Sequence, residues 1–180
     1  ERADLLVQRG QVLTVLGRFA EGERDLSHAA ALAPDSVDYQ YEHGIAALRL
    51  GRFDVGWRAY EHRWRMPHLG PQQSPYGASG LAVRLTLDAE LADLAGKSVL
   101  LVDEQGVGDH IMFSSMLPDL QATVGTLTCL CTPRMVGLFE ASFPGITFLS
   151  TVPGETLDVA PYDLLAPMGS LGRLYRNALA

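Results

Sequence analysis

The chain has 180 residues, of which 47% are hydrophobic, and it carries a formal net charge of −7 at pH 7. This apolar content supports a buried core, whereas the acidic balance excludes the basic footprint that binding to nucleic acid or to an anionic membrane surface requires. No apolar run is long enough to predict a membrane span, and no secretory signal opens the chain, so we expect a cytoplasmic protein.

A repeat with an offset of 34 residues occupies the first third of the chain. The repeated positions are Gly10, Leu16-Gly17-Arg18-Phe19 and Gly22, which recur as Gly44, Leu50-Gly51-Arg52-Phe53 and Gly56. Apolar residues at helical spacing run up to each Leu-Gly pair, and a second helix is expected to begin near each Phe. Residues 3–66 are therefore predicted to form four antiparallel helices, with breaks at Gly17, near Pro34 and at Gly51.

The repeated glycines have two expected roles. Gly10 and Gly22, like their counterparts one repeat later, lack a side chain and are expected to let paired helices approach closely. Gly17 and its counterpart are expected to end the first helix of each pair, because a left-handed backbone costs glycine little. The pattern resembles the tetratricopeptide family over residues 3–67. That resemblance implies two helical hairpins with a protein or peptide as their partner.

The second copy departs from that family in its last turn. Arg63 stands where the family has Ala, and His68 where it has Pro, which suits a terminal repeat. Trp57, Tyr60 and Trp64 lie three and four residues apart and form one aromatic stripe on the last helix. The stripe is interpreted either as core that packs on the following domain or as a platform on which a peptide or sugar stacks.

Residues 68–96 are interpreted as a linker. Pro, Gly, Gln and Ser are frequent between residues 67 and 80, as in loops. After them Val83, Leu85 and Leu87 alternate with polar residues, which is the pattern of an edge strand.

From Lys97 onward, short apolar runs alternate with helical segments. Strands are predicted at 98–103, 127–132, 146–150 and 162–165, and helices up to about 122, over 133–142 and from about 170. The apolar side of the first of these helices is expected to carry Ile111, Met112, Ser115, Met116 and Leu117. This alternation predicts a parallel sheet with right-handed crossovers.

The chain is therefore assigned to the α plus α/β class. Two helical hairpins are expected over residues 1–67, a linker over 68–96 and a Rossmann-like half domain over 97–180.

The turn after the first predicted strand spans residues 104–109. Residues 105–110 are the expected ligand site, since α/β folds place ligands at the carboxyl ends of strands and at helix N-termini. A dinucleotide fingerprint is disfavoured there, because Ile111 replaces the third Gly or Ala and no acidic residue closes the second strand. Arg134 is a weaker candidate for binding an anion. No metal site is expected, because Cys and His lack zinc spacing, and Cys129 and Cys131 are interpreted as buried thiols.

The turn and its surroundings resemble the glycosyltransferase-like domains appended to bacterial tetratricopeptide proteins, and the opening of heptosyltransferase-type enzymes, where a Gly-Asp pair begins the first helix. The resemblance rests on Glu104-Gln105-Gly106-Val107-Gly108-Asp109, Ile111, Phe113, Leu117-Pro118 and Leu120, and on Gly56-Trp57, Tyr60-Glu61 and Arg63-Trp64-Arg65. This chain departs from the resemblance in the linker. The similar proteins usually have a compact segment that contains Trp there, whereas Pro71 to Gly80 contains none.

The resemblance implies the N-terminal, acceptor-binding half of a GT-B fold, of the heptosyltransferase or O-GlcNAc-transferase type. The half that holds a nucleotide-sugar donor is expected only in a complete protein. We therefore expect this chain to bind no cofactor itself.

For the site, the resemblance implies that Asp109 accepts the proton of an acceptor hydroxyl, whereas its position alone is equally that of a helix cap. Gln105 would hold a substrate hydroxyl through its amide. Gly106 and Gly108 would let a ligand approach the backbone, or they serve a tight turn alone. His110 is interpreted either as a ligand of a hydroxyl or phosphate group or as a polar residue at the sheet edge.

Two functions of different class stay open. In the first, the repeats recruit a glycan or protein acceptor to a glycosyltransferase that uses a nucleotide sugar. In the second, the chain is a non-catalytic protein interaction scaffold with a degenerate α/β domain. The chain opens on Glu rather than Met and stops inside a predicted helix without a cap. We therefore expect a fragment of a longer protein, inactive by itself.

Overall fold

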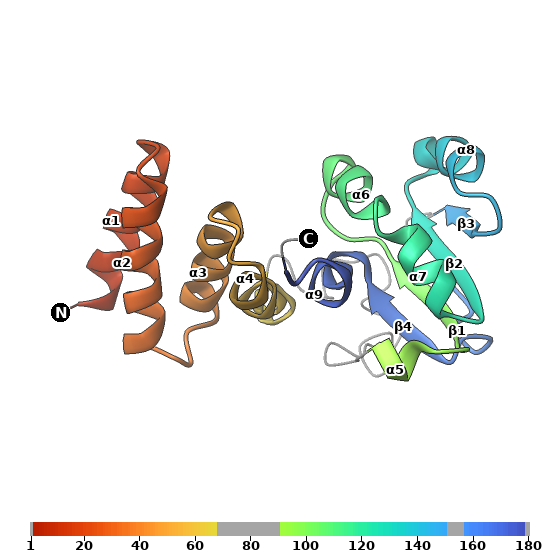
Figure 1. Cartoon of the computed structure of the whole chain (residues 1–180), viewed down its shortest axis with the longest axis horizontal. Helices are drawn as coiled ribbons and strands as arrows, with labels where there is room; N and C mark the ends of the chain where they lie inside the picture. The colour runs from red at the N-terminus through yellow and green to blue at the C-terminus, as the bar shows by residue number, and fades with distance from the viewer. Residues whose placement is uncertain (1, 68–90, 151–156, 179–180) are drawn as a thin grey trace. The chain divides into compact units, whose positions relative to one another are not determined.

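The computed structural model describes residues 2–67, 91–150 and 157–178. These residues form helices and one four-stranded parallel sheet (Figure 1), so the chain is of the α plus α/β class. The predicted edge strand at Val83 to Leu87 lies outside the described residues, and the described end of the predicted linker holds the short helix α5, Leu91–Leu94. No described helix has the length and apolar character of a membrane span.

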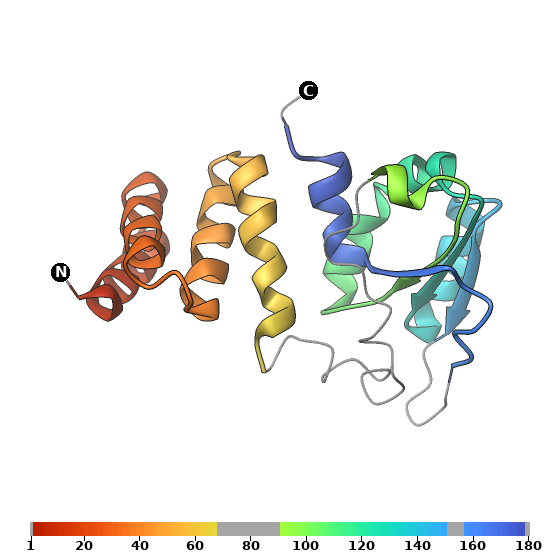
Figure 2. The same ribbon diagram turned by 90° about the horizontal axis from the view of Figure 1, so that it is seen from below.

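The first third of the chain is helical, as predicted (Figure 2). Its elements are α1 Ala3–Val15, α2 Phe19–Leu32, α3 Val37–Arg49, α4 Phe53–Tyr60 and the 3-10 helix η1 Glu61–Arg65. The breaks after α1 and α3 fall at Gly17, with φ 76°, and at Gly51, with φ 72°. Both glycines adopt the left-handed backbone expected for them. The last helix differs from the prediction, because it ends in a 3-10 turn.

The four other repeated glycines lie where helices touch. A Cβ atom on Gly10 would lie 2.8 Å from the side chain of Leu26, and one on Gly56 would lie 2.7 Å from that of Leu48. On Gly44 it would lie 2.8 Å from the backbone nitrogen of Tyr60. Gly22 is confined in the same way by Gly10 and Thr14. These distances are shorter than real Cβ contacts, so the close approach requires glycine.

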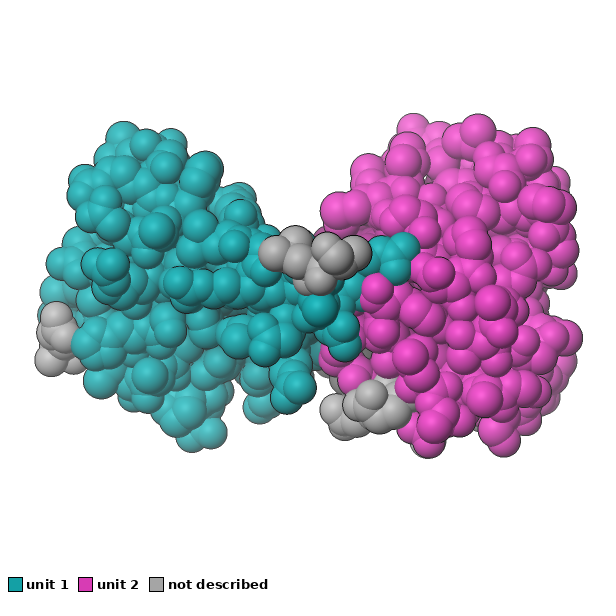
Figure 3. Space-filling model, in the orientation of Figure 1, with its two compact units in different colours: residues 1–70, 176–180 teal, residues 71–175 magenta. Residues whose placement is uncertain are grey.

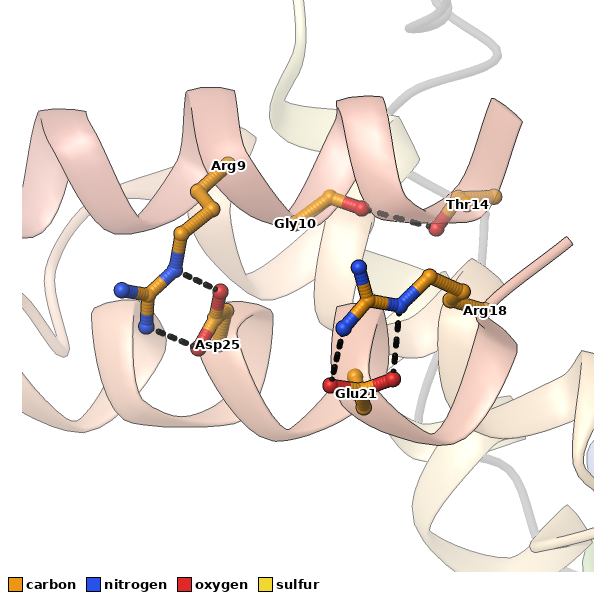
Figure 4. Close-up of polar contacts among 6 residues, drawn as sticks. All are labelled: Arg9, Gly10, Thr14, Arg18, Glu21 and Asp25. Atoms are coloured by element: carbon orange, nitrogen blue, oxygen red, sulfur yellow. Dashed lines mark hydrogen bonds and ion pairs between the residues drawn. The ribbon is translucent and has the colours of Figure 1, made fainter. Parts of the chain in front are cut away.

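Ion pairs join the helices of this region. The guanidinium of Arg9 in α1 donates two hydrogen bonds, of 2.6 and 2.7 Å, to the carboxylate of Asp25 in α2 (Figure 4). Hydrogen bonding from Arg9 lowers the pKa of Asp25, which is buried. Arg52, just before α4, donates a 2.7 Å hydrogen bond to the buried Glu23 of α2. Polar contacts therefore connect the first copy of the repeat with the second, and they also connect the two helices of the first copy.

The aromatic stripe of α4 and η1 is buried at Trp57, Tyr60 and Trp64. The ring of Tyr60 stacks on Tyr41 of α3 with centroids 5.8 Å apart, and Trp57 meets it edge-on at 5.6 Å. The guanidinium of Arg63 lies 4.3 Å from the centre of the Tyr60 ring. A cation over an aromatic face accounts for Arg at a position where the repeat family has Ala. Packing of the stripe on the following domain stays a prediction.

Two compact units divide the chain: Glu1–Gly70 with Arg176–Ala180, and Pro71–Tyr175 (Figure 3). The second unit contains the sheet. Its strands are β1 Ser98–Val102, β2 Thr126–Cys131, β3 Thr147–Ser150 and β4 Leu164–Pro167. They pair in the order β3-β2-β1-β4, and each pair is parallel. The predicted strands are therefore present, with β4 starting two residues later than expected.

The helices of this unit are α6 Val107–Ser114, α7 Leu117–Thr123, α8 Pro133–Ser142, the 3-10 helix η4 Met168–Ser170 and α9 Leu171–Tyr175. The single helix predicted up to about residue 122 is therefore wrong, since it is divided into α6 and α7. The predicted apolar side is also wrong in part. Ile111, Met112 and Ser115 are exposed, whereas α6 buries His110, Phe113 and Ser114. The spacing of residues on one helix face holds only within a single continuous helix. Because the chain breaks between α6 and α7, the two helices bury different sides.

Candidate functional site

The loop after β1 lies where the strand order reverses. β1 pairs with β2 on one side and with β4 on the other. In open α/β sheets, ligands bind outside the carboxyl ends of the strands at such a switch point. The carboxylate of Glu104, in this loop, accepts a hydrogen bond from the backbone N–H of Gly169, which follows β4. The segments that leave β1 and β4 are thus tied together at this edge.

Asp109 caps the helix that follows the loop. Its Oδ2 atom accepts a 3.0 Å hydrogen bond from the backbone N–H of Gly106, the residue before α6. A carboxylate in the first turn is also favoured by the helix dipole. The side chain is half-buried. The capping interpretation is therefore confirmed, and the cap fixes the direction in which the carboxylate points; its catalytic role stays a prediction.

Gly106 and Gly108 are not required by the backbone. Neither has a positive φ, and Gly106 has φ −111° with ψ 172°, which any residue adopts. Among the described residues, a Cβ atom on Gly106 would meet Asp109 at an ordinary 3.5 Å, and one on Gly108 would meet nothing within 4 Å. The backbone angles therefore do not explain the choice of glycine at these two positions. Both glycines are exposed, and the described residues leave open space beside them.

Gln105 carries the backbone strain of this loop. Its φ of 62° is the one positive value of a non-glycine residue in the described part of the chain. A left-handed conformation costs such a residue about 1–2 kcal/mol, and strain of this kind gathers at ligand sites. Gln105 is exposed beside Gly106. The structure thus brings Gln105, Gly106, Gly108 and Asp109 together at the surface of the switch point.

His110 does not share that surface. His110 is 1% exposed, and its role as a ligand of a hydroxyl or phosphate group stays a prediction. Its Nε2 atom lies 4.0 Å from Oδ2 of Asp103, and neither ring nitrogen has a hydrogen-bond partner among the described residues. His110 therefore lies beneath the loop, beside the carboxyl end of β1.

Asp103 and Thr132 were not singled out from the sequence. Each directly follows a buried strand, Asp103 after β1 and Thr132 after β2. Both could have been found from the sequence, because each is the first polar residue after an apolar run and such a position lies at the carboxyl edge of the sheet. Arg134, the candidate for binding an anion, is exposed in the first turn of α8.

Cys129 and Cys131 are buried and form no disulfide, as predicted. Burial, with a smaller contribution from the negative charge of Asp103, raises the pKa of Cys131 to about 11. Burial also raises the pKa of Cys129. Among the described residues no group of three His, Cys, Asp or Glu side chains is placed to hold a metal ion.

A groove in the helical unit lies between α1 and α3. It is lined by Gln11, Thr14, Val15, Leu26, Glu42, Ile45, Ala46 and Arg49. The amide of Gln11 donates a 3.1 Å hydrogen bond to Glu42 across it. Beyond Val15 the hollow continues to Phe19, which is 46% exposed. The groove therefore offers both apolar contact and hydrogen-bonding groups to a partner.

Comparison with other proteins gives one relative. No family model matches the chain, and no solved structure matches it. The chain is similar to Protein FlbA of Caulobacter vibrioides, with 32% identity over 148 residues. The matched region covers 74% of this chain and 23% of FlbA, so the chain spans less than a quarter of the length of that relative.

Proposed function

We propose that this chain is the repeat-bearing, acceptor-binding part of a glycosyltransferase-like protein. In this proposal α1 to α4 are two tetratricopeptide hairpins, and the sheet is the N-terminal half of a GT-B fold. The observation that carries it is the pair Gly106 and Gly108, which the backbone does not require, beside the half-buried Asp109 at the switch point. Open space above glycine backbone at a helix N-terminus suits the close approach of a ligand.

The repeat geometry supports the helical part of the proposal. Gly17 and Gly51, one period apart, share the same left-handed conformation, and α2 and α4 begin at Phe19 and Phe53 with the same offset. The groove between α1 and α3 then has the role of a protein or peptide binding surface. An acceptor held there would be presented at raised effective concentration to a site on the same chain.

In the proposed reaction, Asp109 is the general base. Its carboxylate accepts the proton of an acceptor hydroxyl while that oxygen forms a bond to the anomeric carbon of the donor sugar. The bond from that carbon to the nucleotide diphosphate breaks, and its electron pair leaves with the diphosphate. The cap to Gly106 holds the base in place for this transfer. In this proposal the amide of Gln105, an exposed residue, orients the hydroxyl.

Replacing Asp109 in the complete protein tests this assignment. Asp109→Asn keeps the cap, since Asn caps nearly as well as Asp, but it removes the base and is expected to lower turnover by about 10² to 10⁴. Asp109→Ala loses the cap too and is expected to unfold more easily by about 1 kcal/mol. Turnover is measured with the acceptor and nucleotide sugar, and stability by thermal unfolding.

Asp38→Asn is the matched control, because Asp38 is a carboxylate in the first turn of α3. It is expected to leave turnover unchanged. Full activity of Asp109→Asn would contradict the catalytic role, although the capping role would stand.

A non-catalytic scaffold is the second candidate. It is favoured by the groove of the helical unit and by the use of Asp109 as a cap, which needs no chemistry. A complete protein that binds a peptide but turns over no sugar nucleotide would support it.

The two-half proposal also predicts how this chain behaves alone. Because donor binding is assigned to another half, calorimetric titration of the chain with uridine, guanosine and adenosine diphosphate sugars is expected to show no micromolar binding. Such binding would overturn the assignment of the halves and would favour a nucleotide site at Gly106 and Gly108.

A further inference from the structure

The side chain of His110 is buried near the carboxyl end of β1. His110 is 1% exposed, and both of its ring nitrogens lack a partner among the described residues. Leaving a buried donor or acceptor unsatisfied is unfavourable, because the group has lost its hydrogen bonds to water. Native proteins therefore place a further polar group, from water or a ligand, beside most such atoms. The hydrogen bond that Asp109 accepts from Gly106 does not involve His110, so it does not explain why the ring of His110 is buried.

The carboxylate of Asp103 is a polar neighbour of this ring. Nε2 of His110 and Oδ2 of Asp103 are 4.0 Å apart. That distance is too long for a direct hydrogen bond. It does allow one oxygen atom to lie within hydrogen-bonding distance of both, as bridging oxygens do across polar pairs separated by more than 3.5 Å.

A third polar group belongs to the same edge of the sheet. The Oγ1 atom of Thr132 is buried without a hydrogen-bond partner among the described residues, and it does not cap α8. Leu101 of β1 is in register with Cys129 of β2, so Asp103 lies level with Cys131, the residue before Thr132. Asp103 and Thr132 therefore leave adjacent strands at neighbouring positions. The side chain of Asp103 is 11% exposed, whereas its Oδ1 atom and the Oγ1 atom of Thr132 are buried.

The chemistry of Asp103 and His110 decides which ligand group can bind to both. A carboxylate accepts hydrogen bonds and repels anions, which disfavours a phosphate or another carboxylate between Asp103 and His110. A neutral imidazole donates through one nitrogen and accepts through the other. A hydroxyl group matches this pair, because it donates its proton to the carboxylate and accepts the N–H of the ring.

We propose that Asp103 and His110 bind one hydroxyl group of a neutral sugar or polyol, with Thr132 as a third hydrogen-bonding group at the same edge. The proposal rests on the proposed function in one respect: the hydroxyl is taken to belong to the acceptor. His110 then binds and orients the acceptor, and the proton transfer stays with Asp109.

The test uses this chain with its histidine rings labelled with ¹⁵N. Glycerol, glucose, mannose, galactose and N-acetylglucosamine are added separately, and the ring resonances are followed by NMR. His110, assigned by loss of its signal in His110→Gln, is expected to shift in a saturable manner with at least one sugar. His28 and His43, in the helical unit, serve as internal references and are expected not to shift.

Asp103→Asn is the informative variant. It keeps the shape but removes the charged acceptor, and it is expected to weaken sugar binding about tenfold or more, which is the worth of a hydrogen bond to a charged group. Should Asp103→Asn fail to fold, as judged by its thermal unfolding, Thr132→Val supplies a second variant with an expected loss of affinity.

Three results would overturn the proposal. One is the absence of a His110 shift with every sugar and polyol at the highest soluble concentration, which would leave a structural water only. Another is a shift with inorganic phosphate instead. The third is a sugar-induced shift that persists unchanged in the variants.

Failure here is distinct from failure of the proposed function. Sugar binding at His110 with a fully active Asp109→Asn protein would retain the hydroxyl site and reject the catalytic base. Loss of turnover in Asp109→Asn without any His110 shift would do the reverse.

Discussion

The glycines of the helical unit and those of the loop after β1 have opposite surroundings. In the helical unit, a Cβ atom on Gly44 would come within 2.8 Å of backbone on the neighbouring helix. Just after the loop, in the first turn of α6, a Cβ atom on Gly108 would meet no described atom within 4 Å. The first kind of glycine is explained by the fold alone. The second kind is not explained by any contact with the described residues.

This difference separates packing from function within one chain. Glycine in a helix costs roughly 0.5–1 kcal/mol relative to Ala, because it loses more freedom on folding. At Gly44 that cost is offset by the close contact of α3 with α4. At Gly108, in the first turn of α6, no described contact offsets it. Substitutions at the two kinds of position are therefore expected to have opposite signs.

The largest effect is expected for Gly44→Leu. The new side chain must displace the backbone of α4 near Tyr60, and overpacking of this kind costs roughly 1–3 kcal/mol. The same range is expected for Gly10→Leu. Urea unfolding followed by tryptophan fluorescence measures the loss, because both tryptophans of the chain, Trp57 and Trp64, belong to the helical unit.

Gly137→Leu is the matched control, since Gly137 lies inside α8 with nothing described within 4 Å of its Cβ position. It is expected to cause no loss of stability in thermal unfolding followed by circular dichroism. Equal losses for Gly44→Leu and Gly137→Leu would remove the distinction between the two kinds of glycine.

A smaller effect of opposite sign is expected for Gly108→Ala. Alanine fits the observed backbone, so the variant is expected to be more stable by about 0.4–1 kcal/mol, because its unfolded state has fewer conformations. The added methyl group occupies the open space beside the loop, so the sugar-dependent shift of His110 and the turnover of the complete protein are expected to fall. Unfolding by circular dichroism and sugar titration are measured on the same sample. A more stable variant with unchanged binding and turnover would show that the space is not used.

The last effect concerns the thiols and is confined to alkaline pH. The pKa of Cys131 is raised from its ordinary 9.0 to about 11. Between these two pH values, Cys131 is therefore a thiol in the folded chain and a thiolate in the unfolded chain. The free energy of unfolding is thus expected to be unaffected by Cys131 below pH 9 and to fall as the pH rises from 9 toward 11, by up to about 1.4 kcal/mol per pH unit. Urea titrations across this pH range test the slope.

The variant in which Cys129 and Cys131 are both replaced by Ala is the control, and it is expected to show a flatter dependence on pH. At pH 8 a thiol reagent is expected to react with neither cysteine in the folded chain and with both in urea. Rapid labelling of the folded chain would contradict the burial of the thiols.

Local sequence patterns predicted the elements better than the site. The helix breaks at Gly17 and Gly51 follow from single residues whose conformational freedom is known in advance. The four strands follow from short apolar runs between turn residues, and each lies within two residues of its predicted position.

The site is harder to predict because it depends on which side of a helix meets the sheet. Ile111 and Met112 have the apolar side chains of a core, yet they are exposed, whereas the polar His110 is buried. The break before α7 and the return of the chain to β2 determine which side of α6 faces the sheet. The pattern of apolar residues within the eight residues of α6 does not contain this information. The approach of His110 to Asp103 is a tertiary contact of the same origin.

The place of β1 in the sheet has a consequence for the newly made chain. β1 ends at Val102, but its second neighbour, β4, is complete only at Pro167. During synthesis from the N-terminus, the strand therefore remains a bare hydrogen-bonding edge, with apolar residues on both faces, long after the contacts of the helical segment have been made. Exposed edges of this kind template aggregation, and pairing between distant segments is slow. Recruitment of a chaperone to the nascent chain should therefore peak after Val102 emerges and decline once β4 has emerged.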